Sequence, residues 1–133
     1  MNLRLPFFKI SKTMEVNQNL SIAHKWFEAF NEHNLEKLLS LYDNEAEHFS
    51  PKLKIKKPET NGLVKGKKAL YAWWESAFET LPTLHYSVTS LTANSDRVFM
   101  EYTRTVADEP DMLVAEVLEI KEGKIVFSRV YHG

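Results

Sequence analysis

The alternation of apolar and polar residues in the C-terminal half of the chain predicts four β-strands. Runs rich in β-branched and aromatic residues are separated by short clusters of Asn, Asp, Gly and Pro, which favour turns. The four runs cover residues 84–93, 97–106, 112–121 and 124–132. Because the connections are short, consecutive strands should pair as an antiparallel meander. Such a sheet cannot bury both faces alone, so the N-terminal half has to cover one of them.

Apolar residues at helical spacing predict three helices in the N-terminal half. The first covers residues 14–31, and Asn34 is placed to cap a short second helix. The third covers residues 67–81, where Pro82 ends it. The inner face of the first helix would consist of Val16, Leu20, Ala23, Trp26, Phe27 and Phe30. That of the second would consist of Leu35, Leu38, Leu39 and Tyr42, and that of the third of Leu70, Trp73, Trp74, Ala77, Phe78 and Leu81. The first two helices would form a hairpin that covers the sheet.

The segment between the second and third helices is predicted to be extended. Residues 46–49 are typical of a short strand, which Ser50 and Pro51 would stop. Residues 52–56 alternate strictly between lysine and an aliphatic residue, which predicts a half-exposed strand or the edge of a flap. The lysines of this region form a basic cluster, but no aromatic platform for nucleic acid is interleaved with them. We therefore expect a solvated edge, where lysines also prevent edge-to-edge pairing.

The order of the elements, helices first and a long meander last, predicts a segregated α+β fold. A length of 133 residues with 44% hydrophobic residues fits one domain, which we assign to residues 14–133. Residues 1–13 are interpreted as an N-terminal arm, either loosely held or used for docking. Their apolar patch is too short and broken for a signal peptide, and no run approaches the roughly 20 apolar residues that span a bilayer. We therefore expect a cytoplasmic protein.

Charge and cysteine content exclude several kinds of partner and chemistry. The formal net charge is −1, which argues against a general attraction to nucleic acid or to an anionic membrane. The sequence has no cysteine, so disulfides, thiolate catalysis and cysteine–zinc sites are excluded. We expect no nucleic-acid partner and no membrane partner.

Two short motifs, in this order of elements, resemble those of a known family. His48 and Pro51 form a His-x-x-Pro segment after a short strand, and the last hairpin carries Gly-Lys-Ile at residues 123–125. Together with the glycine-bounded third helix, they resemble the SnoaL-like polyketide cyclase group of the nuclear transport factor 2-like superfamily. The resemblance implies a cystatin-like cone, in which a curved antiparallel sheet and three N-terminal helices enclose a pocket. Members of this family include cyclases, isomerases, hydrolases, dehydratases and non-catalytic binding modules, so the fold leaves the activity open.

Glu116 is the first candidate for a catalytic residue. In its strand it alternates onto one face with Met112, Val114, Leu118 and Ile120. A carboxylate among apolar neighbours indicates a cavity wall, where burial raises its pKa and allows proton transfer near neutral pH. The resemblance places a pocket Asp of the cyclases at the same position. The alternative interpretation is an ion pair of Glu116 with Arg104 or Arg129 across the sheet.

The last strand departs from the family pattern. In the cyclases a His and an acid lie on the pocket side of this strand. Matched from the Gly-Lys-Ile turn, these positions fall on Ser128 and Val130. Serine can donate a hydrogen bond, but valine cannot act as an acid, so the proton-transfer pair of the cyclases is not reproduced.

His48 and Tyr102 complete the predicted catalytic set. An imidazole can move a proton near pH 7, and the resemblance places His48 in the family's His-Asn-Pro segment. A tyrosine hydroxyl can polarise a carbonyl, and Arg104, on the same face as Tyr102, can hold a carboxylate. The alternative for His48 is a hydrogen-bonded packing role, and the alternative for Tyr102 and Arg104 is a sheet face that is exposed or used in dimerisation. The other predicted pocket residues are Trp26, Phe30, Tyr42, Trp74, Phe78, Met100, Leu118, Ser128 and His132.

The leading hypothesis is a pocket for a small apolar or carbonyl-bearing organic ligand. Proton transfer next to the carbonyl, by isomerisation, cyclisation or dehydration, would use Glu116 or His48 as the base and Tyr102 as the hydrogen-bond donor. No cofactor and no metal are expected, because the histidines show no metal-binding spacing and only the fold could join His48, His132 and Glu116. The alternative is a non-catalytic ligand-binding or protein-interaction module.

Both faces of the predicted sheet carry apolar residues. One face has Phe99, Val117, Ile125 and Phe127, and the other has Met100, Leu118 and Val130. The helices and the pocket need only one face, so we expect a homodimer through the other, as the resemblance also suggests.

Overall fold

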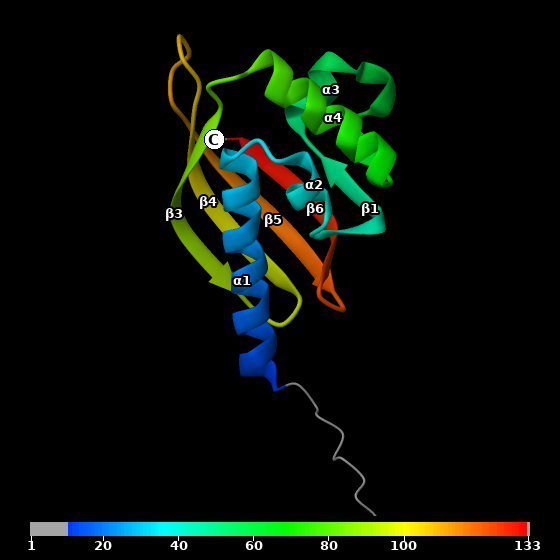
Figure 1. Ribbon diagram of the computed structural model, residues 1–133, viewed down its shortest axis with the longest axis vertical. Helices are drawn as coiled ribbons and strands as arrows, with labels where there is room; N and C mark the ends of the chain where they lie inside the picture. The colour runs from blue at the N-terminus through cyan, green and yellow to red at the C-terminus, as the bar shows by residue number, and fades with distance from the viewer. Residues whose placement is uncertain (1–10, 133) are drawn as a thin grey trace, which may run out of the picture.

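The computed structural model describes residues 11–132, which form one six-stranded sheet covered by helices (Figure 1). The helices in this range are α1 (Lys12–Asn31), α2 (Leu35–Leu39), α3 (Pro51–Lys56), α4 (Lys67–Thr80) and the 3₁₀ turn η1 (Pro58–Thr60). The strands are β1 (Tyr42–Phe49), β2 (Leu63–Lys65), β3 (His85–Ala93), β4 (Arg97–Thr105), β5 (Met112–Lys121) and β6 (Lys124–His132). Most of the predicted N-terminal arm, residues 1–10, lies outside the described residues.

The sheet has the strand order β2-β1-β6-β5-β4-β3. The predicted meander β3 to β6 is antiparallel throughout, and β1 pairs in parallel with the last strand. This arrangement confirms the α+β fold class. It adds one parallel strand pair to the predicted antiparallel sheet and a fourth α-helix among the described residues.

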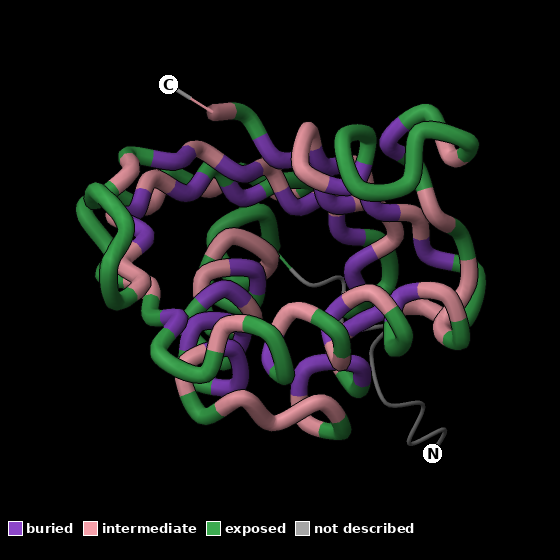
Figure 2. Tube along the Cα trace, turned by 90° about the horizontal axis from the view of Figure 1, so that it is seen from above, coloured by how far each residue is buried: buried purple, intermediate pink, exposed green. Residues whose placement is uncertain are grey.

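The helix α1 lies across the inner face of the sheet (Figures 1 and 2). Ser11 caps its start, because the serine Oγ accepts a hydrogen bond of 3.1 Å from the Met14 N–H. Farther along α1, the Asn19 amide donates to the carbonyl oxygens of Asn94 and Ser95 and so fixes the turn between β3 and β4. Buried residues line the space between the helices and the sheet in Figure 2.

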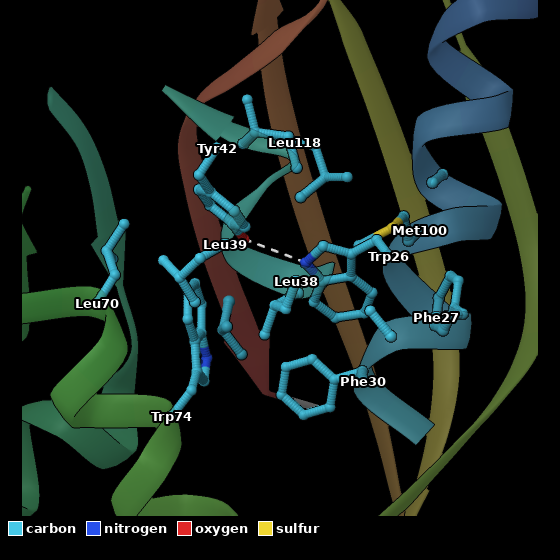
Figure 3. Packing of buried hydrophobic residues seen from close by; sticks show 14 of the residues in the cluster. Trp26, Phe27, Phe30, Leu38, Leu39, Tyr42, Leu70, Trp74, Met100 and Leu118 are labelled. Atoms are coloured by element: carbon cyan, nitrogen blue, oxygen red, sulfur yellow. Dashed lines mark hydrogen bonds between the residues drawn. The ribbon is translucent and has the colours of Figure 1, made fainter. Parts of the chain in front are cut away.

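Aromatic side chains from three elements form the core (Figure 3). Trp26 and Phe30 of α1 point towards Trp74 of α4 and Tyr42 of β1, and all four are nearly inaccessible to solvent. The ring pairs pack at tilted or edge-to-face angles, with centroids 4.9 Å apart for Trp26–Phe30 and 5.0 Å apart for Tyr42–Trp74. These geometries are favourable for aromatic quadrupoles, so the rings add orientation to their burial of apolar area.

The segment after β1 is helical, and the predicted strand or flap edge at residues 52–56 is wrong. Ser50 and Pro51 start α3: the serine Oγ accepts from the Lys52 N–H at 3.2 Å, and proline occupies the first turn. In the helix the two aliphatic residues lie in different environments. Leu53 is fully buried, whereas Ile55 is 77% exposed. The capping signal therefore overrides the alternating pattern.

Two core residues also differ from the prediction. The helix α2 ends at Leu39, so Tyr42 belongs to β1, although it still points into the core. Ile125 was expected on the outer face of the sheet and is fully buried inside. A bulge explains the inversion: the register shifts between Glu119 and Ile120, and strict alternation fails at that point of β6.

None of the helices within residues 11–132 has the length and hydropathy needed to cross a membrane.

Candidate functional site

A cavity of about 70 Å³ lies between the helices and the inner face of the sheet. Six aromatic residues line it, namely Trp26, Phe30, Trp73, Trp74, Tyr86 and Tyr102, together with aliphatic side chains that include Leu81, Leu84, Val114 and Val130. Its polar and charged side chains include His48, Ser50, Lys52, Lys56, Arg104, Glu116 and His132. An apolar wall with a few convergent polar groups is the usual composition of a small-molecule site.

The structure brings together part of the predicted site. Seven predicted residues line the cavity: Trp26, Phe30, His48, Trp74, Tyr102, Glu116 and His132. Five others are buried outside its wall: Tyr42, Phe78, Met100, Leu118 and Ser128. Of these, Tyr42 and Ser128 still contact the site through hydrogen bonds.

The carboxyl group of Glu116 is buried in the cavity wall, and only one of its oxygens is hydrogen-bonded. The Tyr102 hydroxyl donates to Oε1 at 2.7 Å, while Oε2 has no partner among residues 11–132. Burial raises the pKa of Glu116 to about 8, although the hydrogen bond from Tyr102 lowers it. The carboxyl group is therefore mostly protonated at neutral pH and ionises in a mildly alkaline range.

Neither arginine that was considered as a partner pairs with Glu116. The Arg104 Nη1 donates to Glu109 Oε1 at 3.0 Å. The Arg129 guanidinium lies over the rings of Phe49 and Phe127. Glu116 thus keeps its raised pKa because neither arginine compensates the burial of its carboxyl group.

Tyr102 positions Glu116 and stays protonated. Burial and the nearby Glu116 raise the pKa of the tyrosine well above its ordinary value. Its ring packs at a tilted angle against Tyr86, with centroids 4.3 Å apart, and edge-on against Phe27, with centroids 5.5 Å apart. Since the hydroxyl proton is already donated to Glu116, it is not available to a ligand.

His48 ends a chain of buried hydrogen bonds. Trp26 Nε1 donates to the Tyr42 hydroxyl at 3.1 Å, Tyr42 donates to Ser128 Oγ at 3.0 Å, and Ser128 Oγ lies 2.6 Å from His48 Nδ1. The indole has only a donor, so each hydroxyl can pass its own proton onward in the same direction. In the tautomer that continues this direction, Ser128 donates to Nδ1 and the proton of the neutral imidazole lies on Nε2.

Burial supports this neutral state, since it lowers the pKa of His48 to about 3. No hydrogen bond joins Nε2 to another of the described residues. In that tautomer His48 offers an N–H donor at the cavity wall, and its lowered pKa makes it a poor base in either tautomer.

Several lining residues were not found from the sequence. Tyr86 carries no motif, and Lys52 and Lys56 were assigned to a solvated edge. The available signal was the helix start at Ser50 and Pro51, which predicts a helix over the following residues. Lys52 and Lys56 are four residues apart, so in a helix they share one face. Within residues 11–132 no group of three or more His, Cys, Asp or Glu is arranged to hold a metal ion.

The model of the SnoaL-like domain family matches residues 23–128, and the chain belongs to this family. No match was found among curated proteins.

Solved structures with the same fold include a SnoaL-like protein of unknown function from Burkholderia thailandensis, with 25% identity, coverage of 88% of this chain and 95% of that one, and a TM-score of 0.78. A candidate ketosteroid isomerase from Kribbella flavida has 18% identity, coverage of 90% and 80%, and a TM-score of 0.74. A candidate polyketide cyclase from Sinorhizobium meliloti has 14% identity, coverage of 84% and 94%, and a TM-score of 0.71. The last two identities support a shared fold only.

Proposed function

We propose that this SnoaL-like protein binds a small carbonyl compound in the cavity and transfers a proton next to the carbonyl group without a cofactor. The observation that carries the proposal is the buried carboxyl group of Glu116, whose Oε2 has no partner among residues 11–132. A buried, unsatisfied polar atom destabilises a fold, and carboxyl groups with strongly shifted pKa values are enriched at catalytic sites. Isomerisation, cyclisation and dehydration can all begin with this proton transfer.

Glu116 acts as the base and Tyr102 holds it in place. A proton moves from the carbon next to the carbonyl to Oε2, and the same carboxyl group returns it to another atom of the ligand. The His48 Nε2–H donates a hydrogen bond to the carbonyl oxygen, which becomes negatively charged as the proton leaves. These roles replace the sequence-based hypothesis, in which His48 was an alternative base and Tyr102 the donor.

The spacing of the two groups fits a small ligand. His48 is paired with Ser128, and Glu116 with Val130, so the two side chains arise two strands apart and two residues out of register. Ideal sheet dimensions separate their Cα atoms by about 10 Å across the strands and about 7 Å along them. The cavity of about 70 Å³ is below the roughly 300–1,000 Å³ of pockets for drug-sized ligands.

Deuterium exchange of 2-pentanone in D₂O, followed by proton NMR, tests the proposal. We expect the wild-type protein to exchange hydrogens next to the carbonyl, with a rate that rises through about pH 8 as Glu116 ionises. Glu116→Gln should reduce the exchange rate about 100-fold or more. Glu119→Gln is the matched control, since Glu119 is on the same strand but pairs with Arg97 on the exposed face.

A non-catalytic binding module is the competing function, favoured by the replacement of the cyclase His/acid pair by Ser128 and Val130. All three tryptophans of the chain line the cavity, so tryptophan fluorescence reports its occupancy. Saturable binding without exchange between pH 6 and 9 would establish the binding module. Exchange that survives in Glu116→Gln would refute the role of Glu116.

The outer face of the sheet is the surface we propose for a homodimer. Phe99, Leu113 and Tyr131 are each about half exposed there. A twofold contact would bury them against the same residues of a second copy. We expect a dimer in sedimentation equilibrium at micromolar concentration and a monomer for Leu113→Glu; a monomeric wild-type protein would contradict the proposal.

A further inference from the structure

We propose that the ligand of the cavity is a small oxo acid, and that Arg104 binds its carboxylate. The oxo group in this statement rests on the proposed function, whereas the carboxylate rests on the charges described below. Arg104 lies on β4, two residues from Tyr102 and on the same face of the strand, and its side chain is only 5% exposed. Its Nη1 donates to Glu109, but no hydrogen bond joins Nε or Nη2 to another residue within 11–132. A nearly buried guanidinium with unused donors at a cavity wall matches a planar carboxylate.

Other cationic side chains converge on the same end of the cavity. Lys52 and Lys56 come from consecutive turns of α3, and His132 comes from the end of β6. Burial and the proximity of Arg104 lower the pKa of Lys52, and burial with Lys52 and Arg104 lowers the pKa of His132. These groups repel one another, so a bound anion would relieve the repulsion.

One acidic residue, Glu109, offsets part of the positive charge at this end of the cavity, because it pairs with Arg104 and its pKa is also lowered by Lys52 and Lys56. Glu109 partners Arg104, but it is 39% exposed and does not line the wall. The single acidic residue of the wall is Glu116, which is mostly protonated at neutral pH. The cavity is therefore locally positive in a chain whose formal net charge is −1.

The positions of Arg104 and Glu116 at the two ends of the cavity orient the ligand. Along β4, Arg104 is followed inward by Tyr102 and then by Met100, which is the register partner of Glu116. Successive residues on one face are about 7 Å apart, and the long arginine and glutamate side chains span part of the distance. A carboxylate held at Arg104 would therefore leave the carbonyl end of a short acid beside Glu116.

A matched pair of probes tests the inference by titration of tryptophan fluorescence. The acid 4-oxopentanoate and the ketone 2-pentanone have nearly the same shape and differ in the carboxylate. We expect the acid to bind at least about tenfold more tightly at low salt, because hydrogen bonds to charged groups contribute more than neutral ones. The preference should shrink as salt is added. Equal affinities of the wild-type protein for the two probes would overturn the proposal.

Two variants locate the binding group. Arg104→Gln should abolish the preference for the acid, and Glu109→Gln should increase it, because it frees Nη1. If the Arg104–Glu109 ion pair were merely structural, each substitution would weaken the binding of both probes alike. An unchanged ratio of the affinities for the acid and the ketone would therefore refute the assignment to Arg104. Arg129→Gln is the control, since Arg129 packs on aromatic rings outside the cavity.

The test remains decisive if the proposed chemistry fails. The fluorescence titration measures the preference for the acid whether or not exchange occurs. Loss of exchange with the preference intact refutes only the proton transfer, and exchange of both probes without a preference refutes only the carboxylate site.

Discussion

The inner face of the sheet carries two buried polar clusters, and they differ in how completely their atoms are hydrogen-bonded. In the first, Trp26, Tyr42, Ser128 and His48 pass hydrogen bonds along a directed chain, and only one ring nitrogen is left at the cavity. In the second, Tyr102 satisfies one oxygen of Glu116 and the other has no partner among the described residues. The two clusters lie in the same apolar surroundings, so burial alone does not explain the difference.

Burial acts on the two titratable groups in opposite directions but favours the neutral form of both. It lowers the pKa of His48 to about 3 and raises that of Glu116 to about 8. The His48 imidazole is neutral across the physiological pH range, so its charge does not change with pH in that range. The carboxyl group has a pKa within reach of that range and can change its charge there, which is why the proposed function rests on Glu116 and not on His48.

The largest expected effect is on the stability of Glu116→Gln as pH changes. The folded-state pKa of Glu116 lies above its ordinary value of 4.5, so wild-type stability falls as pH rises from about 4.5 to about 8. The variant lacks this loss. It should be more stable than the wild type by on the order of 3–5 kcal/mol at pH 9 and nearly equal to it at pH 4. Urea unfolding at the two pH values measures the difference.

The control for this measurement is again Glu119→Gln, whose carboxylate is exposed. Its stability curve should run parallel to that of the wild type between pH 4 and 9. Parallel curves for Glu116→Gln as well would mean that Glu116 is not buried as a neutral acid, and the contrast between the two clusters would disappear.

A smaller effect is expected from Ser128→Ala, which interrupts the directed chain. The substitution leaves the Tyr42 hydroxyl proton without an acceptor, although its oxygen still accepts from Trp26, and leaves His48 Nδ1 without a partner. Each buried unsatisfied group costs about 1–3 kcal/mol. Urea unfolding at pH 7 should show a loss of roughly this size. The exposed Ser90→Ala is the control and should change stability by less than about 0.5 kcal/mol.

The double variant Tyr42→Phe with Ser128→Ala sharpens the interpretation. Tyr42→Phe removes one of the groups that Ser128→Ala leaves without a partner. The loss of stability in the double variant should therefore be smaller than the sum of the losses in the two single variants. Strict additivity would indicate that the hydroxyls do not act as one chain.

The sequence predicted the elements that depend on local periodicity and failed where local rules compete. The boundaries of β5 and β6 and the burial of Glu116 follow from alternation and turn residues. Alternation also placed Ile125 on the wrong face, because a bulge is a property of the paired strands. It likewise predicted a strand for residues 52–56, where a capping serine and a proline determine the local structure.

The hydrogen-bond chain lay beyond the reach of the sequence for a different reason. Its members come from α1, β1 and β6, and Tyr42 and Ser128 are 86 residues apart. No local pattern encodes a contact of that separation. The same holds for the meeting of Lys52 and Arg104, which depends on where α3 packs against the end of the sheet.

The short helix α3 supplies charge to the cavity but contributes little to the buried core. It places two lysines at the cavity but contributes only Leu53 to the buried core. The groups proposed for proton transfer, Glu116 and His48, are in contrast on strands of the sheet. Replacement of residues 52 and 56 would therefore change the positive charge around Arg104 while the strands of the sheet are kept. The six-residue segment is thus a unit that protein engineering can exchange to strengthen or weaken the attraction for an anion without altering the strands.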